Sequence, residues 1–249
     1  MSESASDTVE VHIDTESLIA AAAARFVEVV AAAQAERGTA SVVLTGGGTG
    51  IGLLELVRKS PGDIDWSSVD FFWGDERFVP AGDAERNDLQ ARQALLDHVP
   101  VDPARVHPVA ASDGEYPDPI EAAAEYSTAV HAYLAEHGSF DLHLLGMGGE
   151  GHINSLFPHT DAVREEHELV VAVTNSPKPP PVRVTLTIPA IRRTRHVVLV
   201  VGGAAKADAV AEAISGADPV DIPSAGAVGL ESTTWLLDQD AASSLQLPD

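Results

Sequence analysis

Residues 140–158, with the sequence FDLHLLGMGGEGHINSLFP, form the stretch around which this chain is organised. The apolar run from Leu142 to Leu145 predicts a short buried strand. Four glycines follow within six residues, and glycine lets the backbone adopt positive φ and approach a ligand closely. His152 comes next, and an imidazole can take up or release a proton near neutral pH. The stretch therefore predicts a strand that ends in a ligand-binding loop with a candidate acid or base.

A second strand with a glycine-rich loop lies earlier in the chain. The β-branched run 41–45 predicts the strand, the glycine-rich run 46–50 follows it, and residues 53–58 have a helical pattern. A strand, a glycine loop and a helix in this order direct backbone N–H groups at an anion. Leu53 stands where a Walker phosphate loop needs lysine, and no third glycine completes a dinucleotide pattern. We therefore expect a plain anion-binding loop.

A third strand of this kind is predicted over residues 196–201. It ends at Gly202-Gly203, and a helix is expected over 204–214. Lys206 lies in the first turn of this helix, where a positive charge opposes the helix dipole. That placement favours an anion bound at the same end of the helix.

A cluster of charged residues follows the aromatic strand that we predict at 69–73. Asp75, Glu76 and Arg77 stand together at the end of this strand, and the rigid Val79-Pro80 follows them. Functional sites of α/β proteins usually lie at the carboxyl ends of strands. The cluster is therefore a functional candidate, although a solvated charge cluster is the ordinary alternative.

The remaining pattern alternates helices with strands. Helices are expected over 14–37, 87–98 and 119–137, and further strands over 168–173, 183–187 and 233–237. This alternation predicts an α/β fold with an open, mainly parallel, Rossmann-like sheet and helices on both faces. We expect a single domain over residues 1–249, with residues 1–10 as a flexible N-terminal tail.

The composition limits the classes of partner. Lys plus Arg is 15 and Asp plus Glu is 38, which gives a net charge of −23. Such an excess argues against binding to nucleic acid or to an anionic membrane, and an anionic ligand would need a local group of cations. The absence of cysteine excludes disulfides and thiolate chemistry. We expect a cytoplasmic protein without a signal peptide or membrane span, either a monomer or a small homo-oligomer.

Glycines 146, 148 and 151 also satisfy the dinucleotide-binding fingerprint after a strand. Two features count against a nicotinamide enzyme. His152 stands where the crossover helix should begin, and Pro158 would cut that helix short. The acidic residue that such a fold needs after its next strand is missing, so we disfavour this interpretation.

Taken together, the motifs resemble the glucosamine-6-phosphate isomerase/6-phosphogluconolactonase family, and within it the lactonases. They are the glycine-rich loop at 46–50, GDERFVP at 74–80, LGMGGEGHINSLFP at 145–158, RVTLT at 183–187 and Gly-Gly-x-x-Lys ending at Lys206. They occur in the family's order from about residue 12 to 240. One departure is Glu150, which stands where the family usually has aspartate.

The resemblance implies the sugar-phosphate deaminase/isomerase fold and the hydrolysis of 6-phosphogluconolactone to 6-phosphogluconate, the second step of the pentose phosphate pathway. It implies no metal and no organic cofactor. Glucosamine-6-phosphate deaminase is the main alternative, but the deaminases carry tyrosine in place of Arg77 and glutamate in place of Phe157. A non-catalytic sugar-phosphate-binding regulator is the other alternative, and the presence of His152 beside Glu150 argues against it.

Lactone hydrolysis needs an activated water, donors for the carbonyl oxygen and a grip on the phosphate. We expect His152 to be the general base, oriented by either Glu150 or Asp75. Water is expected to attack directly, because no Gly-x-Ser-x-Gly elbow is present and Ser155 is a weak nucleophile candidate. Arg77 is expected to contact either the phosphate or the carbonyl.

The substrate-binding candidates come from four parts of the chain. Loop amides of Gly148 and Gly149 are expected to bind the oxyanion. Lys206 and Arg183 are expected to supply charge to the phosphate. The other candidates are Gly46, Gly47, Gly48, Thr49 and Asn87. No metal site is expected among the histidines, and His143 is expected to be structural.

Overall fold

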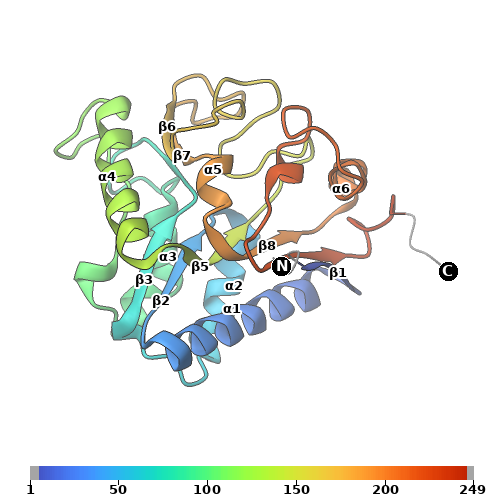
Figure 1. The fold of residues 1–249 in the computed structure, drawn as a ribbon, viewed down its shortest axis with the longest axis horizontal. Helices are drawn as coiled ribbons and strands as arrows, with labels where there is room; N and C mark the ends of the chain where they lie inside the picture. Colours follow the sequence, from blue (N-terminus) through green and yellow to red (C-terminus); the bar gives the residue numbers. More distant parts are fainter. Residues whose placement is uncertain (1–5, 246–249) are drawn as a thin grey trace.

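The structure is a computed structural model, and it describes residues 6–245. Six parallel strands form the main sheet, in the order β1-β9-β8-β5-β2-β3 (Figure 1). Their bounds are Ser6–His12 for β1, Ala40–Leu44 for β2, Val69–Trp73 for β3, Phe140–Leu145 for β5, Thr194–Val201 for β8 and Ser232–Asp238 for β9. The predicted open parallel sheet is confirmed.

Strand β1 corrects one prediction. Residues 6–10, which we expected in a flexible tail, belong to β1 and pair with β9, Ser6 opposite Ser232. The prediction was wrong because the partner strand lies at the other end of the chain, where a local sequence window cannot find it. Residues 1–5 of the predicted tail lie outside the described part of the chain.

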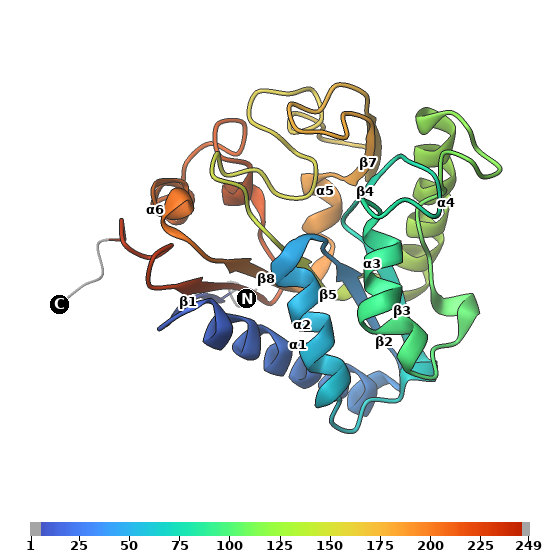
Figure 2. The same cartoon turned by 180° about the vertical axis from the view of Figure 1, so that it is seen from behind.

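Helices cover both faces of the main sheet (Figures 1 and 2). Their bounds are Thr15–Arg37 for α1, Gly47–Lys59 for α2, Asn87–Ala94 for α3, Pro119–His137 for α4, Ile188–Ile191 for α5 and Ala207–Ile214 for α6. Side chains alternate between the faces along each strand. Val42 and Leu44 of β2 therefore pack in the core with α1, α2 and α3, whereas Val43 packs in the core with α4.

Helix α1 is well delimited by its caps. The Asp14 side chain accepts the Ser17 N–H, and Gly38 ends the helix at a φ of 79°. By length and composition alone, this 23-residue helix, which contains an 18-residue window with a mean hydropathy of 1.6, would be sufficient to cross a membrane. Here Leu18 and Phe26 are fully buried in the core, so the apolar composition of the helix serves packing against the sheet.

A small antiparallel sheet was not expected from the sequence. It has the order β4-β7-β6, with bounds Asp75–Arg77 for β4, Arg183–Leu186 for β7 and Val170–Val173 for β6. Strand β4 was missed because three consecutive charged residues carry no strand pattern. The pairing of Asp75 with Thr185 and of Arg77 with Arg183 brings two distant motifs together.

The order of strands places a site between β2 and β5. After β2 the chain forms β3 on one side, and it later returns as β5 on the other side of β2. Such a reversal leaves a crevice outside the carboxyl ends of the two strands, where α/β proteins bind ligands. Gly46 and Gly146 stand at these two ends.

Candidate active site

A cavity of about 250 Å³ lies at the carboxyl ends of β2, β5 and β8. Among the predicted residues, its lining includes Gly46, Gly47, Gly48, Thr49, Asp75, Arg77, Asn87, Gly148, His152, Arg183 and Lys206. Glu150 and Gly149 were predicted but do not line it. Residues that sequence reasoning missed are Thr45, Gly50, Leu53, Gly146, Met147, Asn154 and Val200.

The glycine-rich loop proves to be the start of helix α2. The helix begins at Gly47, with a φ of 82°, rather than at residue 53. Its first turn contains no acidic residue and receives no side-chain cap. The N–H groups in the first turn of a helix have no partner within the helix, and the dipole adds a partial positive charge. The residues of this turn line the cavity, which makes it suited to a phosphate.

Lys206 lines the same cavity as this helix end. It closes the 3₁₀ turn Ala204–Lys206 that follows β8. The Gly203 N–H, at the start of this turn, donates to both carboxylate oxygens of Asp238, at 2.9 and 3.0 Å. Burial lowers the pKa of the Lys206 ammonium, and Asp238 opposes that change. Among the residues described, no carboxylate forms an ion pair with Lys206, so its charge is available to a ligand.

A tight turn places His152 against Gly148. The Gly148 N–H donates to the His152 carbonyl at 2.9 Å, and a Cβ at position 148 would lie 2.0 Å from His152 Nδ1. Only glycine therefore allows the imidazole to occupy this place. The expected role of the Gly148 amide as an oxyanion donor is wrong, because its hydrogen is already bound within the turn.

The imidazole of His152 is packed between an aromatic ring and a carboxylate. Its ring stacks on Phe157 with a centroid distance of 4.4 Å, and Nδ1 lies 3.3 Å from Glu150 Oε1. This contact lacks the alignment of a hydrogen bond, and Nδ1 is buried. Burial lowers the pKa of His152, against the opposing effect of Glu150. The neutral imidazole is thereby favoured, as a general base requires.

Asp75, the other candidate for orienting His152, is held by different partners. Its Oδ2 accepts the Ser155 hydroxyl at 2.6 Å, and its Oδ1 lies 3.3 Å from Asn87 Nδ2. Ser155 is buried behind this contact and does not line the cavity, which argues against its role as a nucleophile. The carboxylate in contact with His152 is therefore Glu150.

The two arginines that line the cavity differ in how many hydrogen bonds their guanidinium groups donate within the protein. Arg183 is buried, with Nε donating to the Pro180 carbonyl, Nη2 to two further carbonyls and Nη1 to Ser155. Arg77 donates from Nη1 to the Glu85 carbonyl at 2.6 Å. Arg77 consequently keeps more of its donors for a ligand than Arg183 does, although both side chains line the cavity.

A buried acid positions the cavity wall. Glu76 is fully buried, and its carboxyl oxygens accept the N–H groups of Arg77, Asn87 and Asp88. Two of these groups belong to the first turn of α3, so Glu76 holds the helix that presents Asn87 to the cavity. Burial raises the pKa of Glu76 to about 7, while Arg86 and the backbone donors oppose the rise.

The raised pKa of Glu76 predicts a pH dependence of stability. The folded protein retains a proton on Glu76 between pH 4.5 and about 7, whereas the unfolded chain loses it near the ordinary value of 4.5. This contribution to the free energy of unfolding is present below pH 4.5 and disappears as the pH rises through about 7. The stability of the wild type relative to Glu76→Gln should therefore fall by up to about 3 kcal/mol over this range.

Denaturant unfolding of both proteins at several pH values measures this difference. The exposed Glu212→Gln on α6 provides the control, because it makes the same chemical change without burial. The assignment would be contradicted if the free energy of unfolding of the wild type, relative to that of Glu76→Gln, stayed constant or rose between pH 4.5 and 7.

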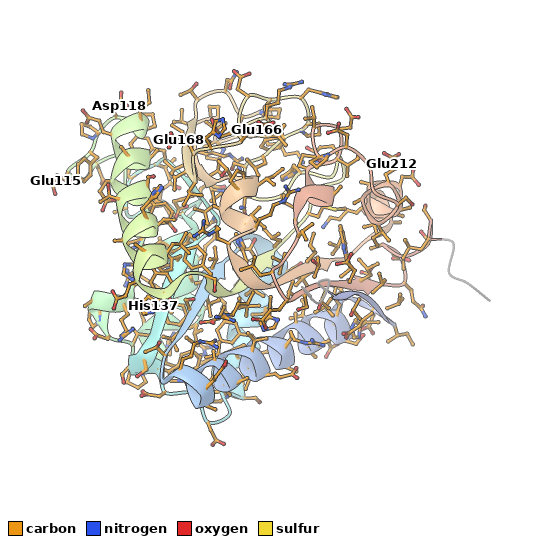
Figure 3. All side chains as sticks on the ribbon, in the orientation of Figure 1. Glu115, Asp118, His137, Glu166, Glu168 and Glu212 are labelled. Carbon is orange, nitrogen blue, oxygen red and sulfur yellow. The ribbon has the colours of Figure 1, made fainter. Side chains whose placement is uncertain are left out.

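Cations gather at the cavity of an otherwise acidic protein. Arg77, Arg183 and Lys206 line it together with a single carboxylate, Asp75. The acidic residues labelled in Figure 3 are exposed and do not line the cavity; they are Glu115, Asp118, Glu166, Glu168 and Glu212. The local group of cations that a −23 protein needs for an anionic ligand is thus present.

His143 lies behind Asn154, which lines the cavity. Burial lowers the pKa of His143 to about 3, so this histidine stays neutral and is structural, as expected. Asn154 has a φ of 48°, an uncommon conformation outside glycine, and its amide atoms are buried near His143. Its place in the motif at 145–158 was the available indication, but its asparagine side chain suggested no specific role.

Comparison with known protein families gives one match that spans most of the chain. Residues 13–235 match the family described as glucosamine-6-phosphate isomerases/6-phosphogluconolactonase. Among curated proteins, the chain is similar to the 6-phosphogluconolactonase of Mycobacterium tuberculosis. The two are 56% identical over 244 residues, which cover 96% of this chain and 99% of that protein.

Two further comparisons agree with this match. The 6-phosphogluconolactonase of Streptomyces coelicolor is 54% identical over 250 residues, covering 96% of each chain. Among solved structures, 6-phosphogluconolactonase from Trypanosoma cruzi superimposes with a TM-score of 0.83 at 29% identity, covering 98% of this chain and 99% of that chain. The similarity therefore extends over the sheet, the cavity and every motif described above.

Proposed function

The chain belongs to the glucosamine-6-phosphate isomerase/6-phosphogluconolactonase family, and we propose that within it the chain hydrolyses 6-phosphogluconolactone to 6-phosphogluconate. The single observation that carries this proposal is the shared cavity: His152 lines it together with Lys206 and the first turn of α2. One end of the cavity is suited to a phosphate and another part holds a neutral imidazole. A phosphorylated ester of sugar size needs both.

The phosphate is proposed to bind at the first turn of α2 and at Lys206. Backbone N–H groups and an ammonium together provide donors and positive charge for its oxygens. Arg77, which keeps free donors, would contact the phosphate or the lactone carbonyl. Asn87, held by Glu76, borders the same space and would contact the sugar.

The reaction is proposed to proceed by direct attack of water. Nδ1 of His152 faces Glu150, which leaves Nε2 to accept a proton as the water oxygen bonds to the lactone carbonyl carbon. The bond between that carbon and the ring oxygen then breaks, and the proton on Nε2 passes to the departing oxygen. The products are a carboxylic acid and a hydroxyl group, and no metal or organic cofactor is needed.

The family alternative, deamination of glucosamine 6-phosphate, is disfavoured by Phe157. Its ring stacks on His152, so an apolar face occupies the place where the deaminases carry glutamate. The identity of more than half with curated lactonases supports the same choice. We further propose a single-domain, cytoplasmic enzyme that is a monomer or a small homo-oligomer.

The proposal predicts acid release from freshly prepared 6-phosphogluconolactone well above the spontaneous rate. A pH-stat with the purified protein measures this release, and the protein-free reaction gives the background. The same preparation should liberate no ammonia from glucosamine 6-phosphate. Ammonia release would support the deaminase alternative, and binding without turnover of either compound would support a regulator.

A further inference from the structure

Lys178 approaches the candidate base from a part of the chain that sequence analysis left without a role. It lies in the segment 177–181, which contains four prolines and connects β6 to β7. Its ammonium lies 2.8 and 2.9 Å from the two carboxylate oxygens of Glu150. The same carboxylate lies 3.3 Å from His152 Nδ1, so one acid joins Lys178 to the base.

The backbone of this segment is held in place by hydrogen bonds from Arg183. This buried guanidinium donates to the carbonyls of Lys178, Pro179 and Pro180 at 3.0 to 3.2 Å. The Ser176 N–H closes the segment by donating to the Pro181 carbonyl at 2.8 Å. These hydrogen bonds from Arg183 fix the backbone at Lys178, whose side chain contacts Glu150.

The side chain of Lys178 also packs near the aromatic ring that stacks on the base. Its ammonium lies 5.9 Å from the centre of the Phe157 ring, within the range of a cation–π contact. His152 stacks on the same ring. The longer side chain of Glu150, compared with the aspartate usual in the family, extends its carboxylate to meet both Lys178 and His152.

We propose that Lys178 is a positioning residue for the general base: through Glu150 it holds the imidazole of His152 in place and keeps it unprotonated. This inference rests on the proposed function, because a protonated imidazole cannot accept a proton from water. Lys178 does not line the cavity, so we assign it no contact with the substrate.

The charges that face His152 explain why Lys178 is expected to lower the pKa of the imidazole. They are Glu150 from its own loop, Asp75 from β4 and Lys178 from the proline segment. Burial is the main reason that the pKa of His152 is lowered; the two carboxylates raise it, and Lys178 lowers it. The hydrogen bond from Lys178, against the effect of burial, also lowers the pKa of Glu150 to about 2, so Glu150 remains charged. Without Lys178, no positive charge would offset the two carboxylates, and only burial would oppose their effect on the pKa of His152.

The test is Lys178→Met, which removes the charge and keeps most of the side chain. The pKa of His152, followed by NMR titration and assigned with His152→Ala, should rise by about 0.5 to 1. The acidic limb of the kcat/KM profile should move by the same amount, so that activity at pH values well below the pKa falls about three- to tenfold, with little change at pH 8. Lys178→Arg should restore most of both properties.

Two comparisons separate this role from a general loss of charge or structure. Lys59→Met makes the same change at an exposed position at the end of α2, and it should move neither the titration nor the profile. In a Glu150→Gln background, Lys178→Met should shift the pKa of His152 by less than half as much, because the carboxylate that holds the ammonium near the imidazole is then missing.

An unchanged or lowered pKa of His152 in Lys178→Met would overturn the inference. A rise of the same size in the pKa of His152 in Lys59→Met would also overturn it. The titration needs no substrate, which separates the two proposals. A protein without lactonase activity whose His152 still responds to Lys178→Met would contradict only the proposed function, and an active enzyme without that response would contradict only the role of Lys178.

Discussion

Replacement of His152 by alanine is expected to lower kcat for lactone hydrolysis by about 10²–10⁴-fold, the usual contribution of a positioned general base. The imidazole lines the cavity, and burial favours its neutral form. KM should change little, because Lys206 and the first turn of α2, which are proposed to hold the phosphate, are untouched. Initial rates of acid release, corrected for spontaneous hydrolysis, measure both constants.

The matched control for this variant is His131→Ala. His131 is exposed on α4, and its Nδ1 contacts the Ser127 carbonyl of the same helix at 2.8 Å. This change should leave kcat and KM as in the wild type. Retention of most of the activity by a folded His152→Ala protein would contradict the general-base assignment and leave binding as the function of the cavity.

The second large effect is expected from Lys206→Met. A hydrogen bond to a charged group contributes about 1.5–3 kcal/mol, which corresponds to about 10–150-fold in affinity. KM should therefore rise by up to about 10²-fold, whereas kcat at saturation should stay within a few-fold of the wild-type value. Methionine preserves most of the buried stem and removes the ammonium, so packing around the turn Ala204–Lys206 should survive.

Inorganic phosphate gives this prediction a readout that does not depend on turnover. Phosphate should inhibit the wild type competitively and should protect it against thermal unfolding, because it is proposed to bind at Lys206 and α2. Both effects should be lost in Lys206→Met and retained in Lys59→Met, which carries the same change in net charge at a remote position. A drop in kcat with unchanged KM and unchanged phosphate binding would place Lys206 in the chemical step instead.

Elements with a strong local pattern were predicted closely from the sequence. Helix α4 was expected over 119–137 and occupies Pro119–His137, because Asp118, Pro119 and Gly138 mark its ends in the sequence itself. Strand β3 was likewise expected and found at 69–73. The start of α2 was placed too late, because consecutive glycines suggest a loop although they can also form the first turn of a helix.

Elements that depend on a distant partner were not predicted. Strand β1 forms because β9 offers an unpaired edge, and β4 forms because β7 lies beside it. Strand β4 consists of three charged residues without a periodic pattern, and the alternation of Val9, Glu10 and Val11 in β1 is too short to identify that strand alone. The same reason explains the missed role of Lys178, since its contact with Glu150 joins two loops that are far apart in the sequence.

For this protein, the amino-acid order alone was sufficient to identify the parallel α/β architecture, the family and many of the residues that line the cavity, because glycines, caps and the histidine motif act over short distances. The folded arrangement was needed to show that Glu150 rather than Asp75 contacts His152, and that the Gly148 amide is already bound. It was also needed to show that Arg183 supports a loop. Each of these outcomes depends on the direction in which a side chain or an N–H group points, and packing between distant segments sets that direction.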